Sequence, residues 1–318
     1  MVNARIFIRN RLGLIFSVIA VYLLVPFIIT MTVTGKVKQN YSDTLISGRS
    51  VTVQYKNASQ SMDINKFIVM VLAARFSASQ EIEVLKAESI MIRTDIYRIM
   101  GDSMNIDSTS LSMSFLTENQ MKNEWKDKYE ENKELLSDCV AATGNYVIMY
   151  NNQYIEARYT NISSGKTLSG EQFLGQEYAY LVPVECQEDI KSPDYLCVTT
   201  FSYKDFVKKI ENVYNQAGVH ENAPFQDIQI VSKTDSGYVA KLQVGNVIMT
   251  GAEFARILEL PSACMIIEDL QGSIKITTKG AGDGLGVSLY TADVMAKQGS
   301  SYEEILKKFY SGITIVSQ

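Results

Sequence analysis

The first long feature of the hydropathy pattern is an uncharged, mostly apolar run from Leu12 to Gly35. At 1.5 Å per helical residue, its 24 residues are long enough to cross the hydrocarbon core of a bilayer. A secretory signal usually has a shorter apolar core and a small-residue cleavage site. The pattern therefore predicts an uncleaved transmembrane helix over 12–35, after a stub of residues 1–11. The alternatives are a cleaved signal or a buried helix.

Basic residues and polar composition predict how the rest of the chain is placed. Slightly more positive charge precedes the apolar run than follows it, so we expect a single-pass protein of the cell membrane with its N-terminus in the cytoplasm. Residues 36–62 are polar and rich in Ser, Thr and Asn, which is typical of a stalk or linker. We expect one domain over 63–318, outside the cytoplasm.

That domain begins with two apolar segments at helical spacing. Asp63 can cap a helix that runs from Ile64 to about Phe76. Ser77 or Ser79 can cap a second helix that ends at Gly101. Two helices joined by a short turn predict a helical hairpin. The apolar stripe of the second helix consists of Ile82, Leu85, Ser89, Ile92 and Ile96.

The remainder of the chain alternates charged helical segments with strand signals. Residues 117–140 predict one solvated helix, because Glu and Lys alternate along it. Asn151-Asn152 lies between two strand patterns over 146–159, which is typical of a type I′ hairpin. The sequence further predicts a strand meander, a helix capped by Thr250, another strand pair and two closing helices. Together these elements predict an α+β fold of antiparallel hairpins and helices.

Composition excludes several classes of function. The 318 residues are 46% hydrophobic and carry a net charge of −5, so there is no electrostatic case for nucleic acid. His220 is the only histidine and lies in an expected exposed loop. The four cysteines form no CxxC pair, so a metal site has few ligands available. Cys186 and Cys197 are close enough in sequence to form a disulfide, which the sequence does not decide.

The glycine-rich stretch "GAGDGLGVSLYTA" (280–292) is the most unusual motif. It lacks the spacing and the following Lys of phosphate-binding loops, and Asp283 alone is too few ligands for calcium. Composition therefore favours a tight, close-packed turn. The acids of the second helix, Glu81, Glu83 and Glu88, are expected to be solvated.

Three segments occur in a recognisable order. They are "IEVLKAESIMIRT" (82–94), "YTNISSGKT" (159–167), and "GAGDGLGVSLYTADVMAKQG" (280–299) followed by "YEEILKKFYSG". In order and approximate spacing they resemble the stage II sporulation protein D (SpoIID/LytB) family. Its patterns are E-A-L-K-A-Q-A-x-A-A-R-T-Y, then F-H-S-T-S-x-G-x-T, then G-x-G-H-G-V-G-M-S-Q-Y-G-A before a helix. The resemblance extends from about residue 63 to 315.

This resemblance implies a membrane-anchored lytic transglycosylase that cleaves peptidoglycan glycan strands during forespore engulfment. The implied partners are those strands, an amidase and a membrane protein of the engulfment complex. A glutamate is the general acid of the family, and burial must raise its pKa so that it can protonate the glycosidic oxygen. We expect no cofactor and no metal, because ligands for the family's zinc site are not evident.

The sequence departs from the family at its polar positions. The glutamate position falls on Arg75, which cannot donate a proton usefully because its pKa exceeds about 12. The two family histidines fall on Thr160 and Asp283. The small and apolar frame is kept. The expected groove residues are Arg75, Lys86, Arg93, Thr94, Ser163, Thr167, Asp283, Ser288 and Tyr290.

Three hypotheses follow. The first is a catalytically degenerate subunit that binds peptidoglycan or assembles a complex. The loss of the glutamate and of both histidines favours it. In this hypothesis Arg75 contacts a carboxylate of muramic acid or of the peptide stem. The second is an active transglycosylase whose acid has moved to Asp283 or Glu81. The third is an extracellular protein-interaction module.

Overall fold

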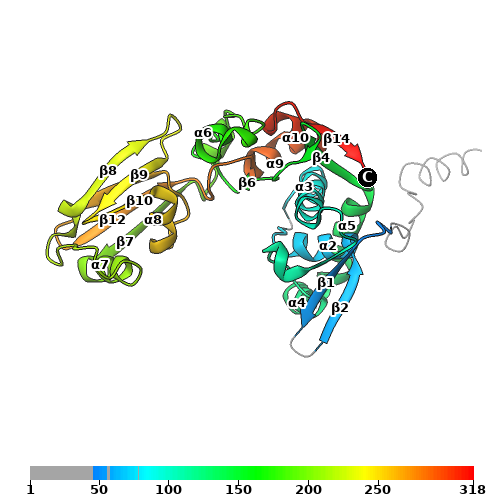
Figure 1. The fold of residues 1–318 in the computed structure, drawn as a ribbon, viewed down its shortest axis with the longest axis horizontal. Coiled ribbons are helices and arrows are strands. Elements are labelled where there is room, and N and C mark those ends of the chain that lie inside the picture. Colours follow the sequence, from blue (N-terminus) through cyan, green and yellow to red (C-terminus); the bar gives the residue numbers. More distant parts are fainter. Residues whose placement is uncertain (1–45, 56–57, 78) are drawn as a thin grey trace, which may run out of the picture. The chain divides into compact units, whose positions relative to one another are not determined.

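The computed structural model describes residues 46–55, 58–77 and 79–318 (Figure 1). Contacts group Leu45–Gln318 into one unit. The predicted membrane helix over 12–35 and its stub lie outside the described residues. Within the described ranges, no helix is both long and apolar enough to cross a membrane. The predicted fold is corrected accordingly: this part of the chain is α+β, with helices and several small sheets, and has no membrane-spanning helix.

The described region opens with a sheet where a linker was predicted. Its strands are β1 (Ser50–Tyr55), β2 (Ala58–Asp63) and β3 (Asn105–Asp107). β1 pairs antiparallel with β2 and parallel with β3. Val51 and Val53 are completely buried, whereas Gln54 and Tyr55 are exposed. The linker prediction for 36–62 is therefore wrong from Ser50 onward. The segment is polar overall, but apolar and polar residues alternate along β1, which is the pattern of a strand.

The predicted helical hairpin is present as α2 (Ile64–Ala73) and α3 (Ile82–Met100). Asp63 caps α2 as predicted, because its carboxylate accepts a hydrogen bond from the Asn65 amide at 2.8 Å. α3 begins after Glu81 without a side-chain cap, so the predicted serine caps are wrong, and it ends before Gly101 as predicted. α3 packs against α2 (Figure 1), and its side chains enter two different hydrophobic cores. Leu85 and Ile92 enter one hydrophobic core, whereas Val84 and Ile90 enter the other.

The charged segment forms two helices where one was predicted. They are α4 (Glu118–Trp125) and α5 (Tyr129–Ala142), joined by the 3-10 turn η3 (Lys126–Lys128). Lys126 has a φ of 49°, which interrupts the helix. Trp125 packs edge-on against Phe76 with ring centroids 5.7 Å apart, whereas α5 packs on α2 and α3. The two halves thus contact different partners, which one straight helix does not allow.

The predicted hairpins after this segment are confirmed. Asn151 and Asn152 both have positive φ, of 49° and 61°, as a type I′ turn requires. The meander, the Thr250-capped helix and the closing helices also form. Two strand pairings are parallel, that of β1 with β3 and that of β6 (Tyr159–Thr160) with β13 (Val287–Ser288), so the arrangement is not purely antiparallel as predicted. The strands are β4 (Tyr146–Tyr150), β5 (Gln153–Tyr154), β6 (Tyr159–Thr160), β7 (Leu196–Ser202), β8 (Ile228–Lys233), β9 (Val239–Val244), β10 (Val247–Thr250), β11 (Met265–Asp269), β12 (Ser273–Lys279), β13 (Val287–Ser288) and β14 (Thr314–Ser317). The helices and 3-10 turns are η2 (Ser108–Leu111), α6 (Gly170–Leu174), η4 (Gln176–Tyr178), η5 (Gln187–Lys191), α7 (Tyr203–Glu211), η6 (Pro224–Asp227), α8 (Gly251–Leu258), α9 (Leu289–Lys297) and α10 (Tyr302–Phe309).

Candidate functional site

The glycine-rich stretch is a close-packed turn, as predicted. Gly280, Gly282, Gly284 and Gly286 all have positive φ. A Cβ at Gly284 would lie 2.5 Å from the ring of Tyr238, and one at Gly286 would overlap the backbone carbonyl of Arg158. Residues other than glycine are therefore excluded both by backbone conformation and by space. The turn places β13 beside β6, with Val287 opposite Tyr159.

Asp283 projects from this turn into an ion-pair chain. One carboxylate oxygen of Asp283 lies 3.2 Å from Nη1 of Arg158, and the other accepts a hydrogen bond from the Leu285 amide at 2.9 Å. Arg158 also pairs with Glu156, at 2.7 Å between Nη2 and Oε1. Burial raises the pKa of Asp283, and the charge of Arg158 opposes this shift. With 39% of its side chain exposed, Asp283 is a solvent-accessible carboxylate that is already engaged by a cation.

Arg75 stacks on Tyr159, the residue that follows Arg158. It follows the C-terminus of α2, and its guanidinium carbon stands 4.6 Å from the ring centroid of Tyr159, the residue next to Arg158. Arg75 is half-buried. Among the residues that the structure describes, no carboxylate lies within ion-pair distance of Arg75. The segment Arg158–Tyr159 thus links the predicted positions Arg75 and Asp283, and Arg75 retains donors for a ligand.

Glu88 is a functional candidate that was wrongly predicted to be solvated. It is 1% exposed, and its Oε2 accepts a hydrogen bond from Gln80 at 2.5 Å. Its Oε1 has no hydrogen-bond partner in the described part of the chain. Burial raises the pKa of Glu88 to about 7, against the opposing effects of the Arg75 charge and the Gln80 hydrogen bond. The family pattern offered a signal for it, because Glu88 stands where that pattern has glutamine.

Several predicted groove residues are structural instead. Arg93 is fully buried, and its guanidinium donates to the Tyr146 and Val140 carbonyls at 3.2 and 3.3 Å. Burial lowers the pKa of Arg93 to about 10. Thr94 is also fully buried and accepts a hydrogen bond from the Ile148 amide at 2.9 Å. Neither residue can line a groove, because both connect α3 to its neighbours.

Ser163 and Ser288 meet at a buried carboxylate that sequence reasoning missed. Asp189 of η5 accepts hydrogen bonds from the Ser163 amide at 2.6 Å, the Ser288 hydroxyl at 2.8 Å and the Thr291 hydroxyl at 2.7 Å. All these groups are buried, so they hold the fold around the glycine turn. Thr167 is likewise buried and bonds the backbone of Val184 at 2.8 Å. No spacing in the sequence connects Asp189 to these residues.

The other predicted site residues lie in separate contacts. Lys86 pairs with Glu83 at 2.6 Å, and Glu83 in turn accepts a hydrogen bond from the Tyr302 amide. The Glu81 amide donates to Asp293 at 2.8 Å. Tyr290 is half-buried at the start of α9, and its amide donates to the Asn161 carbonyl at 3.1 Å. Within the described region, Lys86, Glu81 and Tyr290 form no hydrogen bond or ion pair with Arg75 or Asp283.

The sulfur and imidazole groups give no metal site. Across the described ranges, no three His, Cys, Asp or Glu side chains gather closely enough to hold a metal ion. All four cysteines are free thiols, so Cys186 and Cys197 are not bridged here. His220 is exposed as predicted, with its Nδ1 2.9 Å from Asp227. The residues at the family histidine positions, Thr160 and Asp283, do not fit a zinc site.

Comparison with known proteins assigns the chain to a family. The family model described as stage II sporulation protein matches residues 53–150. Stage II sporulation protein D of Bacillus amyloliquefaciens is 30% identical over 272 residues, which cover 82% of this chain and 77% of that protein. Its counterpart in Bacillus subtilis is 29% identical over the same length. An uncharacterized protein of Brachyspira hyodysenteriae is 26% identical over 262 residues. The chain belongs to the stage II sporulation protein D family.

Proposed function

We propose that this protein acts in sporulation as a peptidoglycan-binding or complex-assembling subunit that does not use the family's catalytic glutamate. The family membership supports a role at the cell wall, and the relatives are named for sporulation. The observation that carries the binding role is Arg75, a half-buried guanidinium stacked on Tyr159 with no carboxylate of the described residues paired to it.

The chemistry of Arg75 suits an anionic wall component. A guanidinium presents a planar set of donors that matches a carboxylate bidentately, and an aromatic ring beneath it restricts its orientation. Peptidoglycan offers such carboxylates on muramic acid and on the peptide stems. Asp283 cannot compete for Arg75 directly, because Arg158 already neutralises it. The proposed place of action is the extracytoplasmic face of the cell, beside an amidase and a membrane protein of the engulfment complex.

Binding to purified wall sacculi tests this role. Arg75→Gln is expected to weaken binding about tenfold, because a charge-assisted hydrogen bond contributes about 1.5–3 kcal/mol. Arg75→Lys should recover only part of it, since an ammonium cannot make the bidentate contact. Arg256→Gln, at an exposed arginine of α8, is the matched control and should bind like the parent protein. Equal binding by Arg75→Gln and the parent would refute the role of Arg75. A parent protein that does not bind sacculi at low salt would favour a protein-interaction module instead.

Glycan cleavage with a relocated acid is a second candidate function, and Glu88 is the observation that favours it. A buried carboxyl with one unpaired oxygen and a pKa raised to about 7 has the protonation behaviour of a general acid. Because its side chain is 1% exposed, this role requires that glycan binding uncovers Glu88. Of the acids predicted earlier, Asp283 is ion-paired, and Glu81 is not among the buried residues. Purified, peptide-stripped glycan strands are the test substrate. Anhydro-sugar release that Glu88→Gln abolishes would establish cleavage, and no release by the parent protein would exclude it.

A further inference from the structure

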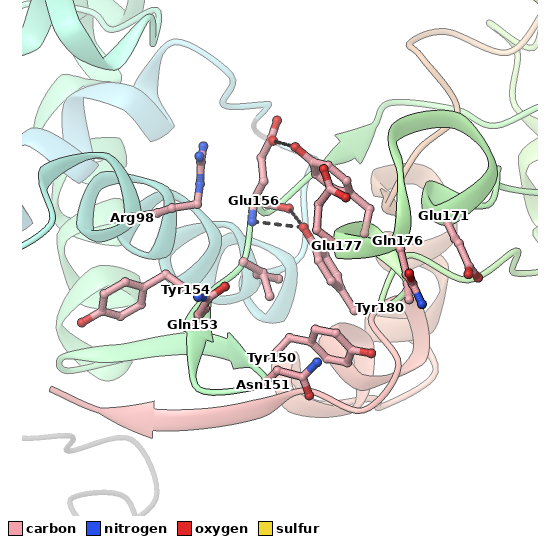
Figure 2. A pocket seen from close by; sticks show the side chains of 13 residues that line it. Arg98, Tyr150, Asn151, Gln153, Tyr154, Glu156, Glu171, Gln176, Glu177 and Tyr180 are labelled. Carbon is pink, nitrogen blue, oxygen red and sulfur yellow. Dashed lines mark hydrogen bonds between the residues drawn. The ribbon is translucent and has the colours of Figure 1, made fainter.

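A pocket of about 610 Å³ opens beside the β4–β5 hairpin (Figure 2). Its volume is within the range of small-ligand sites. The hairpin, the extended segment that contains Glu156, the turn η4 and the end of α3 all contribute side chains to it. None of the predicted site residues lines this pocket.

Aromatic rings form one wall of the pocket. Tyr150, Tyr178 and Tyr180 lie next to one another, with ring centroids 5.4 Å apart for Tyr150 and Tyr180 and 6.1 Å apart for Tyr178 and Tyr180. Tyr154 also lines the pocket. Ring faces of tyrosine attract cations through their quadrupole, and several rings around one volume form an ammonium cage.

Hydrogen bonds hold this wall in place before any ligand binds. The Tyr178 hydroxyl donates to Oε2 of Glu156 at 2.8 Å, and the Tyr180 hydroxyl donates to the Glu156 carbonyl at 3.0 Å (Figure 2). Glu156 also pairs with Arg158, which in turn holds Asp283. The pocket is therefore preorganised and joined to the glycine turn by a continuous ion-pair chain.

The charges at the pocket favour a cation. Glu156 is neutralised by Arg158, and Arg98 has its Nε 3.4 Å from Asp95. Glu171 and Glu177 also line the pocket, and neither forms an ion pair in the described part of the chain. The two unpaired carboxylates leave a net negative potential, which repels carboxylates and attracts an ammonium group.

We propose that this pocket binds a primary ammonium group, presented by the diamino-acid side chain of a peptidoglycan stem peptide. Tyr150 and Tyr178 supply ring faces, with the buried Tyr180 packed behind them, and Glu171 and Glu177 supply the opposite charge. The choice of a stem peptide as the source of the amine rests on the proposed wall-binding function. In that function Arg75 contacts carboxylates, and this pocket contacts amines. The two contacts are chemically complementary, because stem peptides carry both groups.

Titration of the full chain with Nα-acetyl-lysine N-methylamide tests the pocket by itself, since this probe carries one ammonium group and no carboxylate. Saturable binding at pH 7 is expected, and it should weaken as salt is added. The same compound acetylated at Nε should not bind. The double variant Glu171→Gln/Glu177→Gln should bind about tenfold more weakly, whereas Glu130→Gln, at an exposed acid of α5, should be unchanged.

Tyr150 offers a matched pair of variants. Tyr150→Phe keeps the ring and should keep the affinity, whereas Tyr150→Leu should bind about fivefold more weakly through loss of the cation–π contact. The proposal is overturned if the amine does not bind, if the charge-removing double variant binds it equally, or if N-acetylglucosamine saturates the pocket in its place. Sacculi binding that depends on Arg75 would stand in each of those cases, so the failures of the two proposals are distinguishable.

Discussion

The buried carboxyl of Glu88 predicts a specific dependence of stability on pH. The folded protein holds this proton up to about pH 7, whereas the unfolded chain releases it near 4.5. Between these values the folded state binds more protons, so the contribution of Glu88 to stability is largest below pH 4.5 and falls as pH rises towards 7. At 1.36 kcal/mol per pH unit, the full cost is about 3.4 kcal/mol, of which about 2.5 kcal/mol develops between pH 5 and pH 8.

Glu88→Gln removes this titration and leaves an acceptor for the Gln80 amide, in a position where the family pattern has glutamine. The free energy of unfolding, measured by denaturant titration at pH 5 and pH 8, should therefore rise for the variant relative to the parent by about 2.5 kcal/mol over this interval. Subtracting the variant from the parent cancels the other titrating groups. Glu130→Gln is the control, because Glu130 is exposed on α5. A difference that stays constant within about 1 kcal/mol from pH 5 to pH 8 would show that Glu88 is not desolvated as the structure indicates.

Two further predictions concern the glycine turn and the carboxylate beneath it. Gly286→Ala should lower the unfolding free energy by about 3 kcal/mol or more, because it adds both backbone strain and overlap with Arg158. Gly48 is the matched control, since its φ of 73° is close to the 74° of Gly286 but the space around it is open. Gly48→Ala should therefore lower the unfolding free energy by only about 1–2 kcal/mol. Similar losses for the two variants in thermal or denaturant unfolding would contradict the packing argument. Asp189→Leu should destabilise by about 2–4 kcal/mol, because the buried Ser163 amide and the Ser288 and Thr291 hydroxyls would lose their common acceptor. An unchanged denaturation midpoint would count against that network.

Much of the local structure was accessible from the sequence alone. The Asp63 cap, the Asn151-Asn152 turn, the Thr250-capped helix and the glycine turn each depend on the conformational preferences of a few adjacent residues. The ordered motifs also identified the family, because the order of motifs along the chain can be read without knowing which residues are in contact. These features needed no information about which distant segments meet.

Tertiary contacts decided the remainder. The break at Lys126 exists because Trp125 and α5 pack against different neighbours, and β1 is a strand because Val51 and Val53 find a core. Glu88 resembles any helix-surface acid in sequence, and only its enclosure raises its pKa. Arg93 and Ser288 were expected in the groove because they match positions of the family motifs. In the fold, however, Arg93 donates to buried backbone carbonyls and Ser288 donates to Asp189. Burial and partner identity arise from segments far apart in the chain, so neither periodicity nor residue type determines them.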